Sequence, residues 1–110
     1  MSVLSIASGP VTVVTLNRPE VRNAFNEELI AALTDWAIAV SPETTRVAVL
    51  QGAGSIFCAG ADVQWMSKMV GYSREENVAD AMTFARLLNA LDRVPVPLIG
   101  KIQGAVTNLG

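Results

Sequence analysis

VAVLQGAGSIFCAGADVQWMSKM, residues 47–69, contains the pattern that decides the fold of this chain. Its first five residues, Val47–Gln51, are an apolar run rich in β-branched side chains that ends at Gly52, which predicts a buried strand. Asp62 and the apolar residues that follow it at helical spacing predict the start of a helix. We therefore expect a strand, a glycine-rich loop and a helix in succession.

The loop in this stretch has the features of an anion site. Ala59, Gly60 and Ala61 carry almost no side chain, so their backbone can approach a ligand closely. The first N–H groups of a helix lack intrahelical partners, and the helix dipole there favours negative charge. The pattern therefore predicts a site for a phosphate or for an oxyanion that develops during a reaction. A tight strand-to-helix connection without a ligand is the alternative.

Two common nucleotide motifs are disfavoured at this loop. Gly52 and Gly54 match the first two glycines of a dinucleotide-binding Gly-x-Gly-x-x-Gly, but Phe57 occupies the third place. No Gly-Lys-Ser/Thr follows, so the phosphate loop of nucleoside triphosphatases is absent as well.

Composition narrows the possible functions further. The chain has 110 residues, 51% of them hydrophobic, with a net charge of −2, a pI near 4.9 and a mean hydropathy of +0.39. No basic run favours nucleic acid or an anionic membrane, and no apolar run reaches the roughly 20 residues that span a bilayer. One cysteine, Cys58, and no histidine make a zinc site or a cysteine hydrolase improbable. The single thiol and the lack of a secretory leader predict a cytoplasmic protein.

The first half of the chain reads as a hairpin followed by a helix. Val3–Ser8 and Val11–Leu16 are two β-type runs joined by Gly9-Pro10. A polar loop then leads to Asn26, which is a good N-cap for a helix that Ser41-Pro42 ends. Apolar residues at helical spacing predict its buried face: Leu29, Leu33, Trp36 and Val40.

The second half repeats the alternation of helix and strand. Ser73 and Glu76 fit a capping box, which predicts a long helix to about Arg93. Leu98–Ile102 has the pattern of another buried strand. The apolar residues expected along one face of the helix are Val78, Met82, Ala85, Leu88 and Leu91. Met66, Met69 and Met82 are expected in the core.

Two motifs in this order resemble the enoyl-CoA hydratase/isomerase (crotonase) family. FCAGADV, residues 57–63 and preceded by Gly52-Ala53-Gly54, is similar to the family's oxyanion-hole loop, and LNRPEVRNA, residues 16–24, is similar to its N-terminal motif. The resemblance covers nearly the whole chain. It implies an α/β fold, a ClpP/crotonase-like ββα spiral of which residues 1–110 form the N-terminal portion. Residues around Trp65, Met69 and Tyr72 most resemble the methylglutaconyl-CoA hydratase branch, which implies a role in leucine degradation.

The resemblance also implies a site. The N–H of Ala61 would stabilise the thioester oxyanion, and the position of Leu109 matches the family's second donor, where glycine is usual. Arg22 is interpreted either as a solvated loop charge or, from the family, as a partner of the CoA phosphates. The residues implied to bind substrate and CoA are Arg22, Ala24, Ala59, Gly60, Ala61, Asp62, Val63 and Trp65.

The family's two catalytic glutamates correspond to positions beyond Gly110. Glu75, Glu76 and Asp80 are expected on the solvated face of a helix and do not replace them. Whether the chain itself is an enzyme is therefore open. The resemblance implies an acyl-CoA substrate, no separate cofactor and a homotrimer or hexamer, with hydration of a 2-enoyl-CoA in the complete enzyme. The alternative is a non-catalytic fragment that binds CoA weakly or associates with crotonase subunits through uncovered apolar faces.

Overall fold

A computed structural model describes residues 3–54, 57, 71 and 73–101 of the chain. Its elements in chain order are β1 (Leu4–Ala7), β2 (Val11–Leu16), the 3₁₀ helix η1 (Pro19–Val21), α1 (Glu27–Ala39), β3 (Val47–Gly52), α3 (Arg74–Asp92) and β4 (Leu98–Gly100). The helix expected to begin near Asp62 lies outside the described residues. The alternation of strands and helices that the sequence predicts is otherwise present.

The four strands form one mixed sheet in the order β1-β2-β3-β4. The predicted hairpin is confirmed, because β1 pairs antiparallel with β2 and Leu4 lies opposite Leu16. β3 pairs in parallel with both β2 and β4. Leu16, the last residue of β2, lies opposite Gly52, the last residue of β3. The buried strand predicted at Val47–Gln51 is therefore central in the sheet, with a neighbour on either side.

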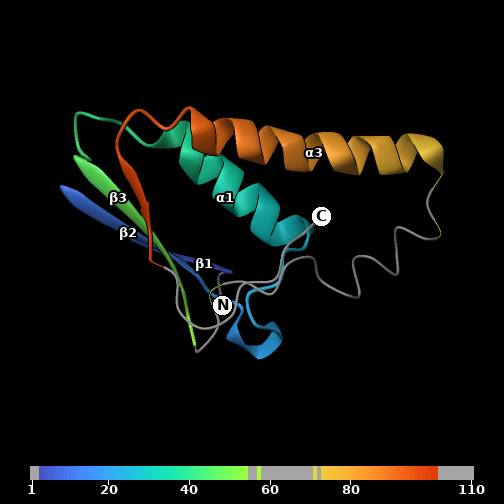
Figure 1. Cartoon of the computed structure of the whole chain (residues 1–110), viewed down its shortest axis with the longest axis horizontal. Helices are drawn as coiled ribbons and strands as arrows, with labels where there is room; N and C mark the ends of the chain where they lie inside the picture. Colours follow the sequence, from blue (N-terminus) through green and yellow to red (C-terminus); the bar gives the residue numbers. More distant parts are fainter. Residues whose placement is uncertain (1–2, 55–56, 58–70, 72, 102–110) are drawn as a thin grey trace.

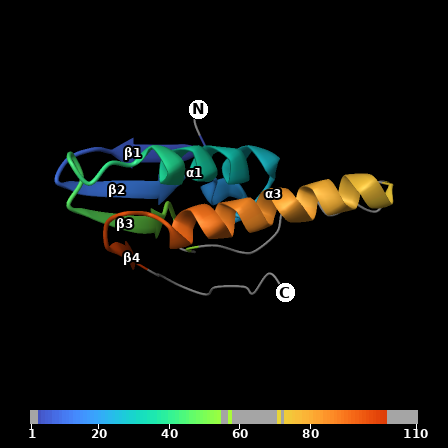
Figure 2. The same cartoon turned by 90° about the horizontal axis from the view of Figure 1, so that it is seen from above.

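Both helices lie on the same side of this sheet, and α3 extends well beyond the strands (Figure 1, Figure 2). Helix α1 begins as predicted, because Asn26 is extended and its side chain accepts a hydrogen bond from the Leu29 N–H at 2.9 Å. It ends at Ala39, with Val40 as its C-cap. The face of α1 that packs against the sheet and α3 includes Leu29, Ile30, Leu33, Trp36 and Ala37.

Helix α3 confirms one prediction and corrects another. Ser73 and Glu76 form the capping box, with both reciprocal hydrogen bonds present. The face expected to be buried is largely exposed, however: Met82, expected in the core, has 61% of its surface exposed, and Val78 has 50%. The buried residues of α3 are instead Leu87 and Ala90, because the carboxyl-terminal half of the helix is the part that lies over α1 and the sheet.

One hydrophobic core lies between the sheet and the helices. Phe25, just before α1, meets Phe84 of α3 edge to face, with ring centroids 6.1 Å apart. Burying a large apolar side chain completely stabilises a fold by about 1.5–3 kcal/mol, so these few side chains supply much of the packing energy. The largest of the fully buried apolar side chains are Val14, Leu16, Leu29, Ile30, Leu33 and Leu87.

None of the described helices combines the length and the hydropathy that crossing a bilayer requires.

Candidate functional site

The candidate site lies at the carboxyl ends of the parallel strands β2 and β3. Ligands of open α/β sheets bind outside the carboxyl ends of the strands, where loops carry the functional groups. Here β2 leads into the loop Arg18–Ala24, which contains η1, and β3 leads into Ala53-Gly54. These two loops carry the N-terminal motif and the beginning of the glycine-rich motif.

Asn23 joins the two loops. Its side chain is fully buried, its Nδ2 donates to the Ala53 carbonyl at 2.8 Å, and its Oδ1 accepts from the Arg18 N–H at 2.8 Å. Its own N–H donates to the Arg18 carbonyl at 2.8 Å. One residue therefore closes its own loop and holds that loop against the end of β3.

Close packing around Gly52 completes this junction. A Cβ at Gly52 would lie 2.5 Å from the Phe57 carbonyl oxygen and 2.8 Å from Asn23 Nδ2, so only glycine fits. Gly54 adopts a positive φ of 84°, and a Cβ there would lie 3.2 Å from Pro19 Cβ. Gly52 and Gly54 thus allow the two loops to lie close to each other.

Among the predicted CoA-binding residues, the structure describes Arg22 and Ala24. Arg22 is exposed and left-handed, with φ of 56°, and its N–H donates to the Pro19 carbonyl at 3.1 Å. Ala24 is buried, and the Arg18 guanidinium donates to its carbonyl. The remaining predicted site residues lie outside the described residues, and their roles stay predictions: Ala59, Gly60, Ala61, Asp62, Val63, Trp65 and Leu109.

Sequence reasoning did not single out Asn23 and Arg18, whose hydrogen bonds hold the loop Arg18–Ala24 together. A weak signal for Asn23 was available, because asparagine tolerates the left-handed conformation better than other non-glycine residues. Arg18 gave no such signal, since its bond to Ala24 depends on how η1 folds back.

The acidic residues of α3 are placed in two different ways. Glu75 and Glu76 are exposed, as expected. Asp80 is only partly exposed, and its Oδ2 is buried without a hydrogen-bond partner, so the expectation of a solvated carboxylate was wrong there. Within the described ranges, no three histidine, cysteine, aspartate or glutamate side chains are grouped to hold a metal ion.

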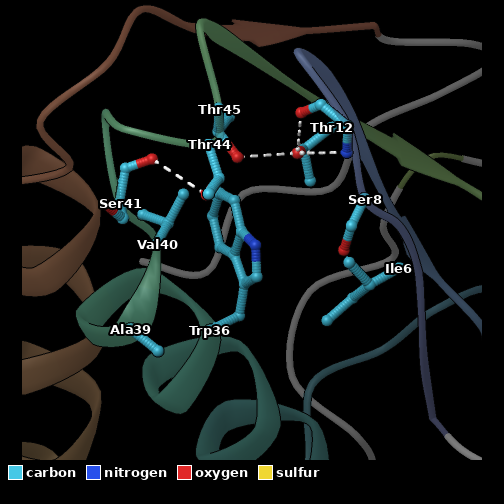
Figure 3. A pocket seen from close by; sticks show the side chains of 10 residues that line it. Ile6, Ser8, Thr12, Trp36, Ala39, Val40, Ser41, Thr44 and Thr45 are labelled. Carbon is cyan, nitrogen blue, oxygen red and sulfur yellow. Dashed lines mark hydrogen bonds between the residues drawn. The ribbon is translucent and has the colours of Figure 1, made fainter.

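A cavity of about 470 Å³ lies at the opposite end of the same strands (Figure 3). Trp36, confirmed as a buried residue, projects into it from α1 between Val40 and Ile6. Thr12 and Thr45 close one side with a hydroxyl–hydroxyl hydrogen bond of 2.9 Å. Of the residues predicted for the acyl-CoA site, the two that the structure describes, Arg22 and Ala24, do not line this cavity.

Solved structures with the same arrangement are enzymes of the crotonase fold. An enoyl-CoA hydratase from Shewanella pealeana superposes with a TM-score of 0.84 at 35% sequence identity, over 93% of this chain and 39% of that protein. The predicted fold class is therefore confirmed.

The sequence model for Enoyl-CoA hydratase/isomerase matches residues 7–110, and the chain belongs to this family. The probable enoyl-CoA hydratase echA6 of Mycobacterium leprae is 37% identical over 108 residues, covering 94% of this chain and 40% of that protein. The mevalonyl-coenzyme A hydratase SIDH of Beauveria bassiana is 39% identical over 103 residues, covering 84% of this chain and 36% of that protein. The chain thus spans about two fifths of the length of the relatives it matches.

Proposed function

We propose that this chain supplies the CoA-binding and oxyanion-binding part of an enzyme that hydrates a 2-enoyl-CoA through an enolate. The observation that carries the proposal is the hydrogen bond from Asn23 to the Ala53 carbonyl, which holds two family motifs together at one end of the sheet. Family membership supports chemistry on acyl-CoA thioesters. The substrate, the mechanism and the site residues are our proposals.

The proposed chemistry needs donors for the enolate oxygen. In our proposal the Ala61 N–H is the first donor, because this residue follows Ala59-Gly60 in the stretch that resembles the family's oxyanion-hole loop. The N–H of Leu109 is the second, at a position where the family usually has glycine. A single donor of this kind contributes about 3–4 kcal/mol to transition-state stabilisation in a comparable site.

CoA would lie across the two joined loops. Arg22 is exposed, and a guanidinium pairs well with phosphate groups, so we assign it to the CoA phosphates. Ala24 and the stretch Ala59–Val63 would line the path of the pantetheine, because small side chains let it approach the backbone. Trp65 would border the acyl group.

For the acyl group we propose a branched substrate such as 3-methylglutaconyl-CoA. The support is the resemblance of the residues around Trp65 and Tyr72 to that branch of the family. SIDH, by its name a hydratase of another CoA thioester, is among the relatives that share this part of the sequence.

Exposed apolar side chains favour a second candidate function. Val78, Met82 and Leu88 on α3 and Ile99 on β4 are all at least half exposed, and exposed apolar side chains that gather into a patch favour association. The chain would then bind CoA weakly and associate with other crotonase segments or subunits. A homotrimer or hexamer is the family's usual assembly and our expectation for this protein.

Titration calorimetry of the purified chain with CoA tests the proposal, with ATP as a control for nonspecific phosphate binding. We expect saturable binding of CoA and weaker binding of ATP. Hydration assays with crotonyl-CoA and 3-methylglutaconyl-CoA measure the rate of the proposed reaction. Turnover is expected only when the segment that carries the family's two catalytic glutamates is also present. If CoA does not bind, or binds no better than ATP, the proposal is wrong.

A further inference from the structure

We propose that Asn23 is a positioning residue that fixes the loop Arg18–Ala24 on the end of β3 and so holds Arg22 ready for CoA. The inference rests on the proposed function, because the ligand is the one assigned there. It adds a residue that contacts no substrate itself and acts through the residues on either side of it.

The hydrogen bonds of Asn23 use both ends of its amide. Oδ1 accepts from the Arg18 N–H within the loop, and Nδ2 donates to the Ala53 carbonyl 30 positions further along the chain, each at 2.8 Å. The Asn23 side chain is fully buried, so its amide depends on these two bonds rather than on water. An aspartate would keep the acceptor toward Arg18 but would face the Ala53 carbonyl with a second acceptor.

Backbone strain at this position points the same way. Arg22 and Asn23 are consecutive non-glycine residues in the left-handed region, with φ of 56° and 57°. Each such residue is disfavoured, and strained residues of this kind gather at ligand sites, where the surrounding structure holds them. The bonds of Asn23 hold this pair, together with the bond from the Arg22 N–H to the Pro19 carbonyl.

The expected consequence is a preorganised binding loop. Arg22 is exposed and directly precedes Asn23. Because the Asn23 side chain is bonded to Ala53 at the end of β3, it also sets the direction of the backbone at Arg22. A loop that is already ordered loses less conformational freedom when a ligand binds, and affinity rises accordingly. Without Asn23 the loop must be ordered by CoA itself.

The chain offers a matched control at the other end of the same strands. Thr12 is also buried. Within its own loop its hydroxyl donates to the Gly9 carbonyl at 3.0 Å and accepts from the Gly9 N–H at 3.4 Å, and it makes one distant bond, to Thr45, 33 positions away. Thr12→Val removes these bonds without touching the proposed site. A purely structural role for Asn23 predicts the same effects for the two changes.

The test measures CoA affinity by calorimetry for wild type, Asn23→Gly, Asn23→Asp and Thr12→Val under conditions where each is folded. Asn23→Gly keeps the left-handed backbone and removes the amide, and Asn23→Asp serves as well if the glycine variant does not fold. We expect both to weaken CoA binding about tenfold, as loss of preorganisation does, and Thr12→Val to leave it within about twofold. Amide exchange of Ala53, whose N–H donates to the Leu16 carbonyl, should accelerate in the Asn23 variants alone.

The outcomes separate this inference from the proposed function. If wild type binds CoA and the Asn23 variants bind equally well, or if Thr12→Val weakens binding as much, the inference is wrong and the function stands. Unchanged exchange at Ala53 in the Asn23 variants also overturns the inference, whatever the ligand. If wild type does not bind CoA, the proposed function fails and the ligand assigned to this loop fails with it.

Discussion

The two ends of the parallel pair β2–β3 are built from the same kind of interaction and differ in strain. At the amino end, the buried Thr12 hydroxyl bonds its own loop and Thr45; at the carboxyl end, the buried Asn23 amide bonds its own loop and Ala53. In the part of the chain that the structure describes, the residues with positive φ all lie at the carboxyl end: Arg22, Asn23 and Gly54.

This difference separates stability from function. A polar link between two loops does not require backbone strain, because the link at the amino end is made without it. Strain that packing and hydrogen bonds hold in place is typical of ligand sites. The carboxyl ends of parallel strands are also where such folds bind ligands, so strain and topology indicate the same end.

Gly52→Ala should show the largest difference between the two ends. The new Cβ would lie 2.5 Å from the Phe57 carbonyl oxygen, so backbone must move, and overpacking of this kind costs about 1–3 kcal/mol. Gly9→Ala is the control at the amino end, where the nearest atom to a Cβ is the Val11 carbonyl oxygen at 3.6 Å, an ordinary contact. Measured by urea unfolding, the free energy of unfolding should fall by an amount near the top of that range for Gly52→Ala. For Gly9→Ala it should change by no more than about 0.5 kcal/mol. Equal losses would remove the distinction between the ends.

Gly54→Ala should have the next largest effect. An alanine at φ of 84° is strained by roughly 1–2 kcal/mol, and its Cβ would also press on Pro19 at 3.2 Å. Gly100→Ala in β4 is the matched control, because no atom of the described residues lies within 4 Å of a Cβ there. The free energy of unfolding is again the measurement, and a larger loss for Gly100→Ala than for Gly54→Ala would contradict the assignment of strain to the carboxyl end.

Most of the fold could be predicted from local sequence, and the reasons are visible in particular residues. Asn26 and Ser73 cap their helices through neighbours three positions away, so the signal is contained in a few residues. Gly9-Pro10 gives the hairpin in the same way. The exposure of Met82 could not be read from spacing, because it depends on where α3 runs past the sheet.

The candidate site was less predictable than the fold. Its motif residues were identified by resemblance, but the bond that joins them spans 30 positions, from Asn23 to Ala53, and no local pattern encodes it. The buried Oδ2 of Asp80 was missed for the same reason, since burial of one carboxylate oxygen is set by tertiary packing.

Arg22→Ala tests whether the carboxyl end contributes charge to ligand binding. Arg22 is exposed, so its removal should change the free energy of unfolding by no more than about 0.5 kcal/mol. Loss of a phosphate contact should raise the dissociation constant for CoA about fivefold and make binding less sensitive to salt. In the complete enzyme, KM should rise more than kcat falls, as for loss of uniform binding. Arg46→Ala, an exposed arginine at the amino end, is the control, and an equal effect there would show general attraction rather than a site.

Met82→Lys should have the smallest effect on the free energy of unfolding, and it tests a surface of α3 rather than either end of the strand pair. Met82 and Val78 lie one turn apart on α3, both at least half exposed, so a lysine at position 82 should change the free energy of unfolding by less than about 0.5 kcal/mol. If this face associates with another crotonase segment or a second copy, a buried charge there should lower the association constant about tenfold or more, because full burial of a methionine contributes about 1.5–3 kcal/mol. Light scattering over a range of concentrations measures the association, and Val11→Lys, at an exposed apolar residue at the amino end of β2, is the control. CoA affinity should be the same in both variants. A loss of CoA binding in Met82→Lys would mean that the ligand site is not confined to the carboxyl end of the sheet.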